Sequence, residues 1–235
     1  MVVAEIIAGG VGNRMKMEMP KQFFKIHHKP ILAYTLEVFQ ENPIVDDIVV
    51  VCLSGWEDVV ESYKTRYNIT KLKAVIKGGS FGQESIKNGI DYISANYDSE
   101  DIVLIHDGIR PLVDDAVLND AIATCKTYGN GVSSIPYTEQ IFVKSTDFST
   151  KKYIPRDNLV KVVTPQAYKI GIVTEAYKEA FEKKIGISKS SYTNTMMVEL
   201  GYELFFSSGS NKNIKLTNPE DIELFKALLE INKNS

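Results

Sequence analysis

Three glycines within four positions, close to two cationic side chains, form the stretch of this sequence best suited to chemistry. It follows a short apolar run and reads Ala8-Gly9-Gly10-Val11-Gly12-Asn13-Arg14-Met15, with Pro20-Lys21-Gln22 soon after. Glycines let a backbone turn sharply without a Cβ in the way, so that successive N–H groups can converge on an anion. Arg14 can bind phosphate oxygens bidentately, and Lys21 adds a point charge. The combination predicts a polyphosphate site.

Two common glycine-loop motifs do not fit this stretch. The dinucleotide fingerprint needs glycine where this chain has Met15, and a P-loop needs Gly-Lys followed by Ser or Thr. The stretch instead resembles the signature of the cytidylyltransferases that make CDP-alcohols from a sugar or polyol phosphate, Ala-Gly-Gly-x-Gly-x-Arg-Met followed by Pro-Lys-Gln. The alternative is a tight strand-to-helix turn that happens to have basic residues nearby.

Composition limits the classes of protein to consider. With 235 residues, 44% hydrophobic and 24% charged, the chain can bury a full core, and we expect one domain over residues 1–235. A net charge of −3 argues against non-specific binding to nucleic acid. Cys52 and Cys125 show no metal-ligand spacing and are expected as core thiols in a reducing compartment. The absence of a signal-like start or a bilayer-length apolar run favours a cytoplasmic protein with no membrane partner.

Apolar runs alternate with helical patterns along the first half of the chain. Strands are expected at residues 2–7, 48–53, 72–76 and 101–106, and helices at 30–39, 56–67 and 85–95. This alternation predicts an α/β fold with a mostly parallel sheet. The resemblance implies a Rossmann-like three-layer sandwich of the nucleotidyltransferase, glycosyltransferase-A-like kind.

The alternation of strands and helices stops at about Tyr137. Residues 137–160 contain two β-rich runs around a polar turn, which predicts a β-hairpin arm, either a lid or a dimerisation element. The resemblance implies that the arm crosses to a partner subunit, as in a homodimer. A helix at residues 172–183, a strand at 203–207 and a closing helix introduced by Asn218-Pro219 complete the expected elements.

A second glycine-rich loop, residues 77–85, also follows a strand and opens a helix. Ser85 near a helix N-terminus can donate to a carbonyl or a phosphate. In the resembling family this loop holds cytosine and ribose, which implies contacts from Gly79 and Ser80. That family usually has arginine where this chain has Gly82. The alternative is an ordinary turn into a capped helix.

His106-Asp107-Gly108-Ile109-Arg110-Pro111 ends the strand at residues 101–106, at the edge where open α/β sheets bind ligands. Mg²⁺ prefers one or two carboxylates together with phosphate oxygens and water, so Asp107 is the first metal candidate. The motif resembles the family's His-Asp-x-x-Arg-Pro, in which the arginine organises the site for the second substrate. A buried ion pair between Asp107 and Arg110 is the alternative, and His106 is expected to support the loop.

Three later residues complete the candidate site. Ile214-Lys215-Leu216-Thr217 resembles a family motif in which Lys215 would be a third cation for the triphosphate. Arg156, at the base of the hairpin, stands where the family has its acceptor-binding arginine, and it could act in trans. Thr193 stands where the family has Thr-Asp-Asp, implying an acceptor contact. The alternative for Arg156 is a solvated side chain.

Taken together, the resemblance implies transfer of CMP from CTP to a polyol phosphate with release of pyrophosphate. The implied catalytic residues are Arg14, Lys21 and Lys215, and Arg110, Arg156 and Thr193 are implied to bind the acceptor. The implied nucleotide-binding residues are Ala8, Gly9, Gly10, Gly12, Asn13, Arg14, Lys21, Gly79, Ser80, Ser85 and Asp107.

The acceptor is predicted to be D-ribitol 5-phosphate, as in teichoic acid and capsule synthesis. Trp56 and the absence of aspartates at Asn194 and Lys212 resemble the ribitol-5-phosphate branch. The runner-up is the 2-C-methyl-D-erythritol 4-phosphate enzyme of isoprenoid synthesis, and another polyol phosphate stays open. A catalytically silent CTP-binding homologue is a further alternative, suggested by Gly82, Asn194 and Lys212.

Overall fold

A seven-stranded sheet forms the centre of the molecule in the computed structural model, which describes residues 1–10, 19–188 and 192–233. Its strand order is β11-β7-β10-β6-β1-β4-β5. The parallel strands β1 (Val2–Ala8), β4 (Asp47–Cys52), β5 (Leu72–Lys77) and β6 (Ile102–Asp107) form one half. The other half contains β7 (Asn130–Pro136), β10 (Val160–Lys169) and β11 (Phe206–Ser208), in which β10 runs antiparallel to both β6 and β7.

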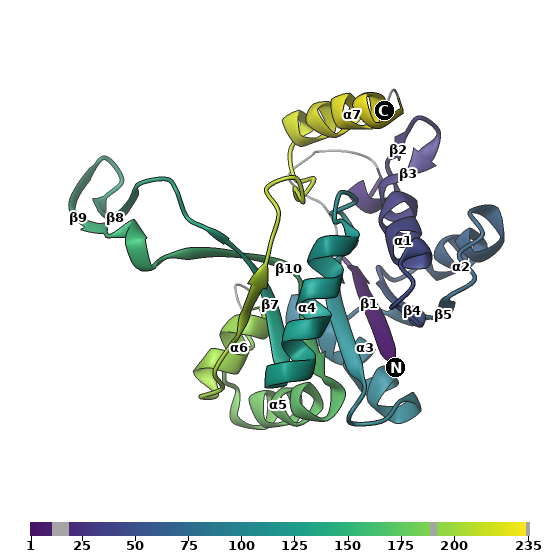
Figure 1. The fold of residues 1–235 in the computed structure, drawn as a ribbon, viewed down its shortest axis with the longest axis horizontal. Coiled ribbons are helices and arrows are strands. Elements are labelled where there is room, and N and C mark those ends of the chain that lie inside the picture. Colours follow the sequence, from purple (N-terminus) through teal and green to yellow (C-terminus); the bar gives the residue numbers. More distant parts are fainter. Residues whose placement is uncertain (11–18, 189–191, 234–235) are drawn as a thin grey trace.

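Helices cover both faces of the sheet, so the fold has the three layers expected (Figure 1). The helices α1 (Ile31–Glu41), α2 (Glu57–Arg66) and α4 (Asp115–Tyr128) pack on the face that receives Ala4 and Ile6 of β1. On the other face, which receives Val3, lie α3 (Gly82–Asn96), α5 (Ile170–Lys183) and α6 (Thr193–Glu199). Apolar side chains on alternate positions of β1 therefore serve two cores. The predicted α/β class is confirmed.

A smaller cluster packs beside the main layers. The final helix α7 (Pro219–Lys233) contributes Ile222 and Phe225, which pack with Ile26 and Leu216. Ile26 belongs to a short hairpin of β2 (Lys25–Ile26) and β3 (Lys29–Pro30). This packing joins the end of the chain to the segment that follows the opening glycine loop. Among the described helices, none is long and apolar enough to cross a bilayer.

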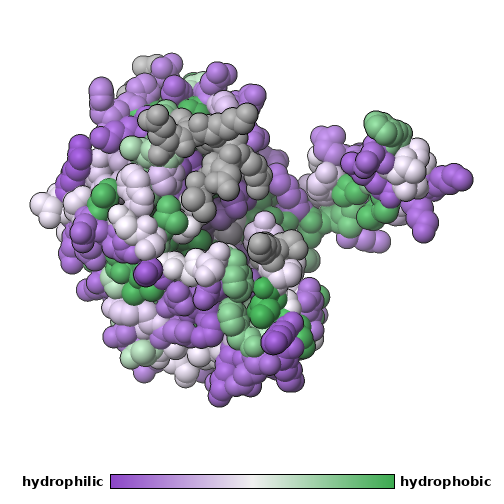
Figure 2. Space-filling view, turned by 180° about the vertical axis from the view of Figure 1, so that it is seen from behind, coloured by the Kyte–Doolittle hydropathy of each residue, from purple (hydrophilic) through white to green (hydrophobic). Residues whose placement is uncertain are grey.

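The predicted hairpin arm is present and projects from the body (Figure 1). It consists of β8 (Ile141–Thr146) and β9 (Ser149–Ile154), followed by the 3₁₀ turn η3 (Arg156–Asn158). Apolar side chains on it face solvent, with Phe142 56% and Tyr153 69% exposed. The arm stands clear of the body (Figure 2), so the rest of the described chain leaves these side chains largely uncovered. An isolated two-stranded hairpin is only marginally stable in water, so the arm would gain stability from a covering partner.

Several elements differ from those expected from the sequence. Helices α4 and α6 and strands β7 and β10 were not predicted, although α4 has clear signals: Asp114 accepts from the Val117 N–H (3.0 Å) and Gly129 ends the helix with φ of 89°. Helix α3 starts three residues earlier than expected because the loop turns directly into it at Gly82. Cys52 and Cys125 are unpaired and fully buried, as predicted.

Candidate active site

Four loops meet where the parallel strands β1, β4, β5 and β6 reach their carboxyl ends. The Gly108 N–H donates to the Ile7 carbonyl (2.9 Å), and the Gly78 N–H donates to the Cys52 carbonyl (2.7 Å). Leu53, which follows β4, donates its N–H to the Ala8 carbonyl (3.2 Å). These bonds hold the loops against neighbouring strand ends, at the edge where open α/β sheets bind ligands.

A buried glutamine fixes the start of the opening loop. Gln22 is 2% exposed, and its Nε2 donates to the carbonyls of Ala8 (2.8 Å) and Gly10 (2.9 Å). Lys21 precedes it in the 3₁₀ turn η2 (Lys21–Phe23), and so is carried next to the glycines. The next residue, Phe23, stacks on Trp56 with ring centroids 4.2 Å apart. The Pro-Lys-Gln motif was recognised from sequence, but the positioning role of its glutamine was not.

Part of the opening loop lies outside the described residues. This applies to Gly12, Asn13 and Arg14, whose roles stay predictions. Of the residues predicted there, the structure places Ala8, Gly9, Gly10 and Lys21.

The second glycine loop packs against the first. A Cβ on Gly9 would lie 3.3 Å from the Ser85 Oγ, and one on Gly79 would lie 2.4 Å from Glu84 Cγ. Ser85 is 4% exposed; its hydroxyl accepts from the Gly79 N–H (3.0 Å) and donates to the Phe81 carbonyl (3.0 Å). The Ser80 N–H donates to Glu84 Oε2 (2.6 Å). The Ser85 hydroxyl thus shapes the loop, and the predicted contacts of this loop with a nucleotide stay predictions.

Asp107 at the end of β6 lies between two cations. Its carboxylate accepts from Arg110 Nε (2.8 Å) and Lys215 Nζ (3.1 Å), and its backbone N–H donates to Thr164 Oγ1 (3.2 Å). Although burial alone would raise it, Lys215 and then Arg110 lower the pKa of Asp107 to about 2. The carboxylate is therefore ionised at neutral pH. The ion pair considered as an alternative is present, and Lys215 joins it.

This carboxylate meets the chemical requirements of a magnesium ligand. A carboxylate has about four lone-pair sites, of which the two cations use two. Among the described residues no cluster of three or more His, Cys, Asp or Glu side chains could hold a metal by itself. Mg²⁺ characteristically takes one or two carboxylates and completes its shell with substrate phosphates and water. Asp107 fits that mode of binding.

His106 is a structural neighbour of Asp107. Its ring is fully buried, and its Nε2 lies 3.1 Å from the Arg110 carbonyl oxygen. Burial lowers the pKa of His106 to about 4, so the imidazole is neutral at pH 7 and Nε2 acts as the donor. This geometry agrees with the expected support of the loop.

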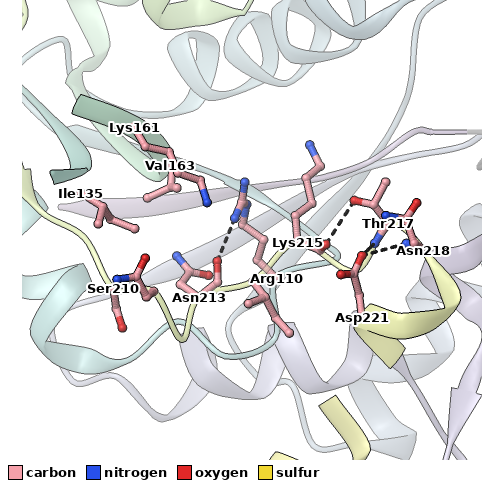
Figure 3. A pocket seen from close by; sticks show the side chains of 12 residues that line it. Arg110, Ile135, Lys161, Val163, Ser210, Asn213, Lys215, Thr217, Asn218 and Asp221 are labelled. Carbon is pink, nitrogen blue, oxygen red and sulfur yellow. Dashed lines mark hydrogen bonds between the residues drawn. The ribbon is translucent and has the colours of Figure 1, made fainter. Parts of the chain in front are cut away.

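The segment containing Lys215 is tied to the loop after β6. Arg110 Nη1 donates to the Asn213 carbonyl (2.8 Å), and the Leu216 N–H donates to the Ile109 carbonyl (2.9 Å). Beside it lies a pocket of about 380 Å³ (Figure 3). Its polar lining includes Arg110, Lys161, Asn213, Lys215, Thr217 and Asp221.

Two predicted acceptor-binding residues lie elsewhere. Arg156 is exposed on the projecting arm, where its Nη1 donates to the Thr138 carbonyl (2.6 Å). Thr193, at the start of α6, is 2% exposed, and its hydroxyl lies 2.7 Å from that of Tyr177, which donates to Gln83. One chain therefore does not bring Arg156 to Asp107, and the Thr193 hydroxyl already has a buried partner. Their acceptor roles stay predictions.

Comparison with known proteins gives a consistent result. A family model described as 2-C-methyl-D-erythritol 4-phosphate cytidylyltransferase (IspD) matches residues 2–231. A ribitol-5-phosphate cytidylyltransferase of Lacticaseibacillus paracasei is 53% identical over 97% of this chain and 98% of its own. A 2-C-methyl-D-erythritol 4-phosphate cytidylyltransferase of Clostridium acetobutylicum is 36% identical over 97% of both chains.

Solved structures show the same fold. The 2-C-methyl-D-erythritol 4-phosphate cytidylyltransferase of Francisella tularensis superposes with a TM-score of 0.78 at 26% identity, covering 95% of this chain and 97% of its own. A crystal structure of 4-diphosphocytidyl-2C-methyl-D-erythritol synthase gives a TM-score of 0.80 at 21% identity, over 97% of this chain and 98% of its own.

Proposed function

Because this chain belongs to the IspD family of cytidylyltransferases, we propose that it transfers CMP from CTP to D-ribitol 5-phosphate, giving CDP-ribitol and pyrophosphate. One observation carries the choice of acceptor. The relative named for ribitol 5-phosphate shares 53% of its residues with this chain, whereas the clostridial relative named for 2-C-methyl-D-erythritol 4-phosphate shares 36%. If ribitol 5-phosphate is the acceptor, the product CDP-ribitol would serve teichoic acid or capsule synthesis, as the resemblance to the ribitol-5-phosphate branch implies.

The reaction needs no nucleophile from the protein. An oxygen of the acceptor phosphate forms a bond to the α-phosphorus of CTP while the bond from that phosphorus to the bridging oxygen of the β-phosphate breaks, and pyrophosphate leaves with that electron pair. The substrates are both anionic, and two unit charges 4 Å apart repel by about 4 kcal/mol at an effective dielectric constant of about 20. The protein's task is to hold both in place against that repulsion.

The positions of the described cations support this proposal. Lys215 lies beside Asp107, and Lys21 is carried next to Gly10 by the bonds of Gln22. Lys21, Lys215 and Arg14 would bind the triphosphate most strongly as charge gathers around the α-phosphorus. Asp107 would hold Mg²⁺, which supplies further neutralisation of the phosphates. Arg110, held by Asp107 and the Asn213 carbonyl, would keep the carboxylate oriented.

The arm supports a homodimer as part of the proposal. Its exposed apolar side chains, including Phe142 and Tyr153, would be covered by a second copy, and Arg156 would then reach the acceptor in the partner's site. The unpaired thiols of Cys52 and Cys125 agree with a reducing compartment, which favours a cytoplasmic location.

A panel assay tests the proposed reaction. Pyrophosphate release would be measured with CTP and Mg²⁺ against ribitol 5-phosphate, glycerol 3-phosphate and 2-C-methyl-D-erythritol 4-phosphate. We expect the highest kcat/KM with ribitol 5-phosphate. A preference for methylerythritol phosphate would establish the runner-up, and CTP binding without pyrophosphate release from any acceptor would establish a silent homologue.

A further inference from the structure

The pocket beside Lys215 contains a cation that the proposed mechanism does not use. Lys161 of β10 lines it together with Arg110 and Lys215, which come from two other segments of the chain. Figure 3 shows the side chains of Lys161 and Arg110 both extending into this space. A volume of about 380 Å³ lies within the range of small-molecule sites.

Strand geometry explains why Lys161 faces the pocket. Side chains alternate between the faces of a strand, so Lys161 and Val163 share one face while Val162 points to the other. Lys161 and Val163 line the pocket, and Val162 packs against the cluster of α3 and α5 on the opposite side. The partner of Lys161 on β7 is Ile135, which also lines the pocket.

Lys161 differs from its two cationic neighbours in having no acidic partner. Arg110 and Lys215 both bind Asp107, whereas the ammonium group of Lys161 makes no ion pair or hydrogen bond with the described part of the chain. The carboxylate among the lining residues, Asp221, accepts from the N–H groups of Thr217 (2.7 Å) and Asn218 (2.8 Å). The ammonium group of Lys161 is therefore available to an anionic ligand.

The strand order indicates on which side of the reacting phosphorus Lys161 lies. In the sheet, β6 lies between β1 and β10, so Asp107 separates the opening glycine loop after β1 from Lys161 on β10. In phosphoryl-type transfer the attacking and leaving oxygens lie roughly in line, on opposite sides of the phosphorus. If the triphosphate tail occupies the glycine loop, the attacking phosphate comes from the side of β10.

We propose that Lys161 binds the phosphate of the acceptor, in the pocket that it lines together with Arg110 and Lys215. The proposal rests on the proposed function for the identity of that ligand. It adds to the mechanism a cation from the same chain that holds the attacking phosphate.

Four proteins test the proposal: the wild type, Lys161→Met, Lys161→Arg and Lys178→Met. The last removes an equal charge from an exposed position on α5 and controls for the overall field of the protein. We expect Lys161→Met to raise the KM for ribitol 5-phosphate about tenfold, as for the loss of one charge-assisted hydrogen bond. The KM for CTP should stay within about twofold, Lys161→Arg should restore most of the acceptor affinity, and Lys178→Met should behave as wild type.

A binding measurement separates this proposal from the identity of the acceptor. Binding of inorganic phosphate at constant ionic strength, followed by ³¹P NMR, should weaken in Lys161→Met even if ribitol 5-phosphate proves not to be the substrate. The proposal is wrong if Lys161→Met retains wild-type phosphate binding, if its KM for CTP rises as much as that for the acceptor, or if Lys178→Met causes an equal change.

Discussion

Replacing Asp107 by asparagine should destabilise the protein by an amount that depends on pH. Although burial alone would raise it, Lys215 and Arg110 lower the pKa of this carboxyl from 3.8 to about 2. At about 1.4 kcal/mol per pKa unit, the folded state gains roughly 2 kcal/mol at pH 7 from the ionised carboxylate. Because the folded pKa is depressed, this stabilisation is fully present above the unfolded pKa and is lost as pH falls through the folded pKa.

Urea denaturation of the wild type and Asp107→Asn would measure the difference in free energy of unfolding. We expect about 2 kcal/mol at pH 7, and roughly half of that at pH 3, between the two pKa values. Glu179→Gln is the matched control, because Glu179 makes a solvent-accessible pair with Lys183 (2.7 Å) on helix α5 and its loss should change stability by less than about 0.5 kcal/mol. A difference for Asp107→Asn that is negligible, or equal at both pH values, would refute the assigned electrostatics.

Three further outcomes are expected. Lys21→Ala should lower turnover by orders of magnitude with an unchanged circular dichroism spectrum, and near-normal turnover would remove Lys21 from the proposed machinery. EDTA should abolish pyrophosphate release and added Mg²⁺ restore it, whereas activity in EDTA would exclude the proposed metal. Burial, and then Asp91, raise the pKa of Glu5, and its carboxyl oxygens are buried without partners among the described residues. Because the ionised form is disfavoured in the folded state, the fold loses stability as pH rises above the unfolded pKa of this carboxyl. Glu5→Gln should therefore raise the Tm more at pH 8 than at pH 5, and an equal gain at both would contradict that assignment.

The sequence predicted the parts of the molecule whose signals are local. The first half of the sheet was predicted because each parallel strand is a short apolar run followed by a helical pattern. Helix α4 is an exception that was not predicted, although its Asp114 cap and the helical spacing of Val117, Leu118, Ala121 and Ile122 are local signals. Strand β11 was expected at residues 203–207 and is found at Phe206–Ser208, because its bounds depend on pairing with β7.

Contacts between distant residues could not be read from spacing. Asp107 and Lys215 are 108 positions apart, and only the fold shows that their side chains meet at 3.1 Å. A family resemblance could suggest that both serve one site, but not that Lys215 holds the carboxylate. Thr193 illustrates the opposite case, since its motif implied a ligand contact while its hydroxyl meets Tyr177 inside the protein.

The stacking of Phe23 on Trp56 gives the protein an intrinsic fluorescence probe. Trp56 is the sole tryptophan of the chain, and its ring touches the turn that carries Lys21 and Gln22. Any change in tryptophan fluorescence when nucleotide is added comes from this one indole, which packs against the turn η2. Titrations with CTP can therefore test the proposed binding at that loop without a dye or an introduced label.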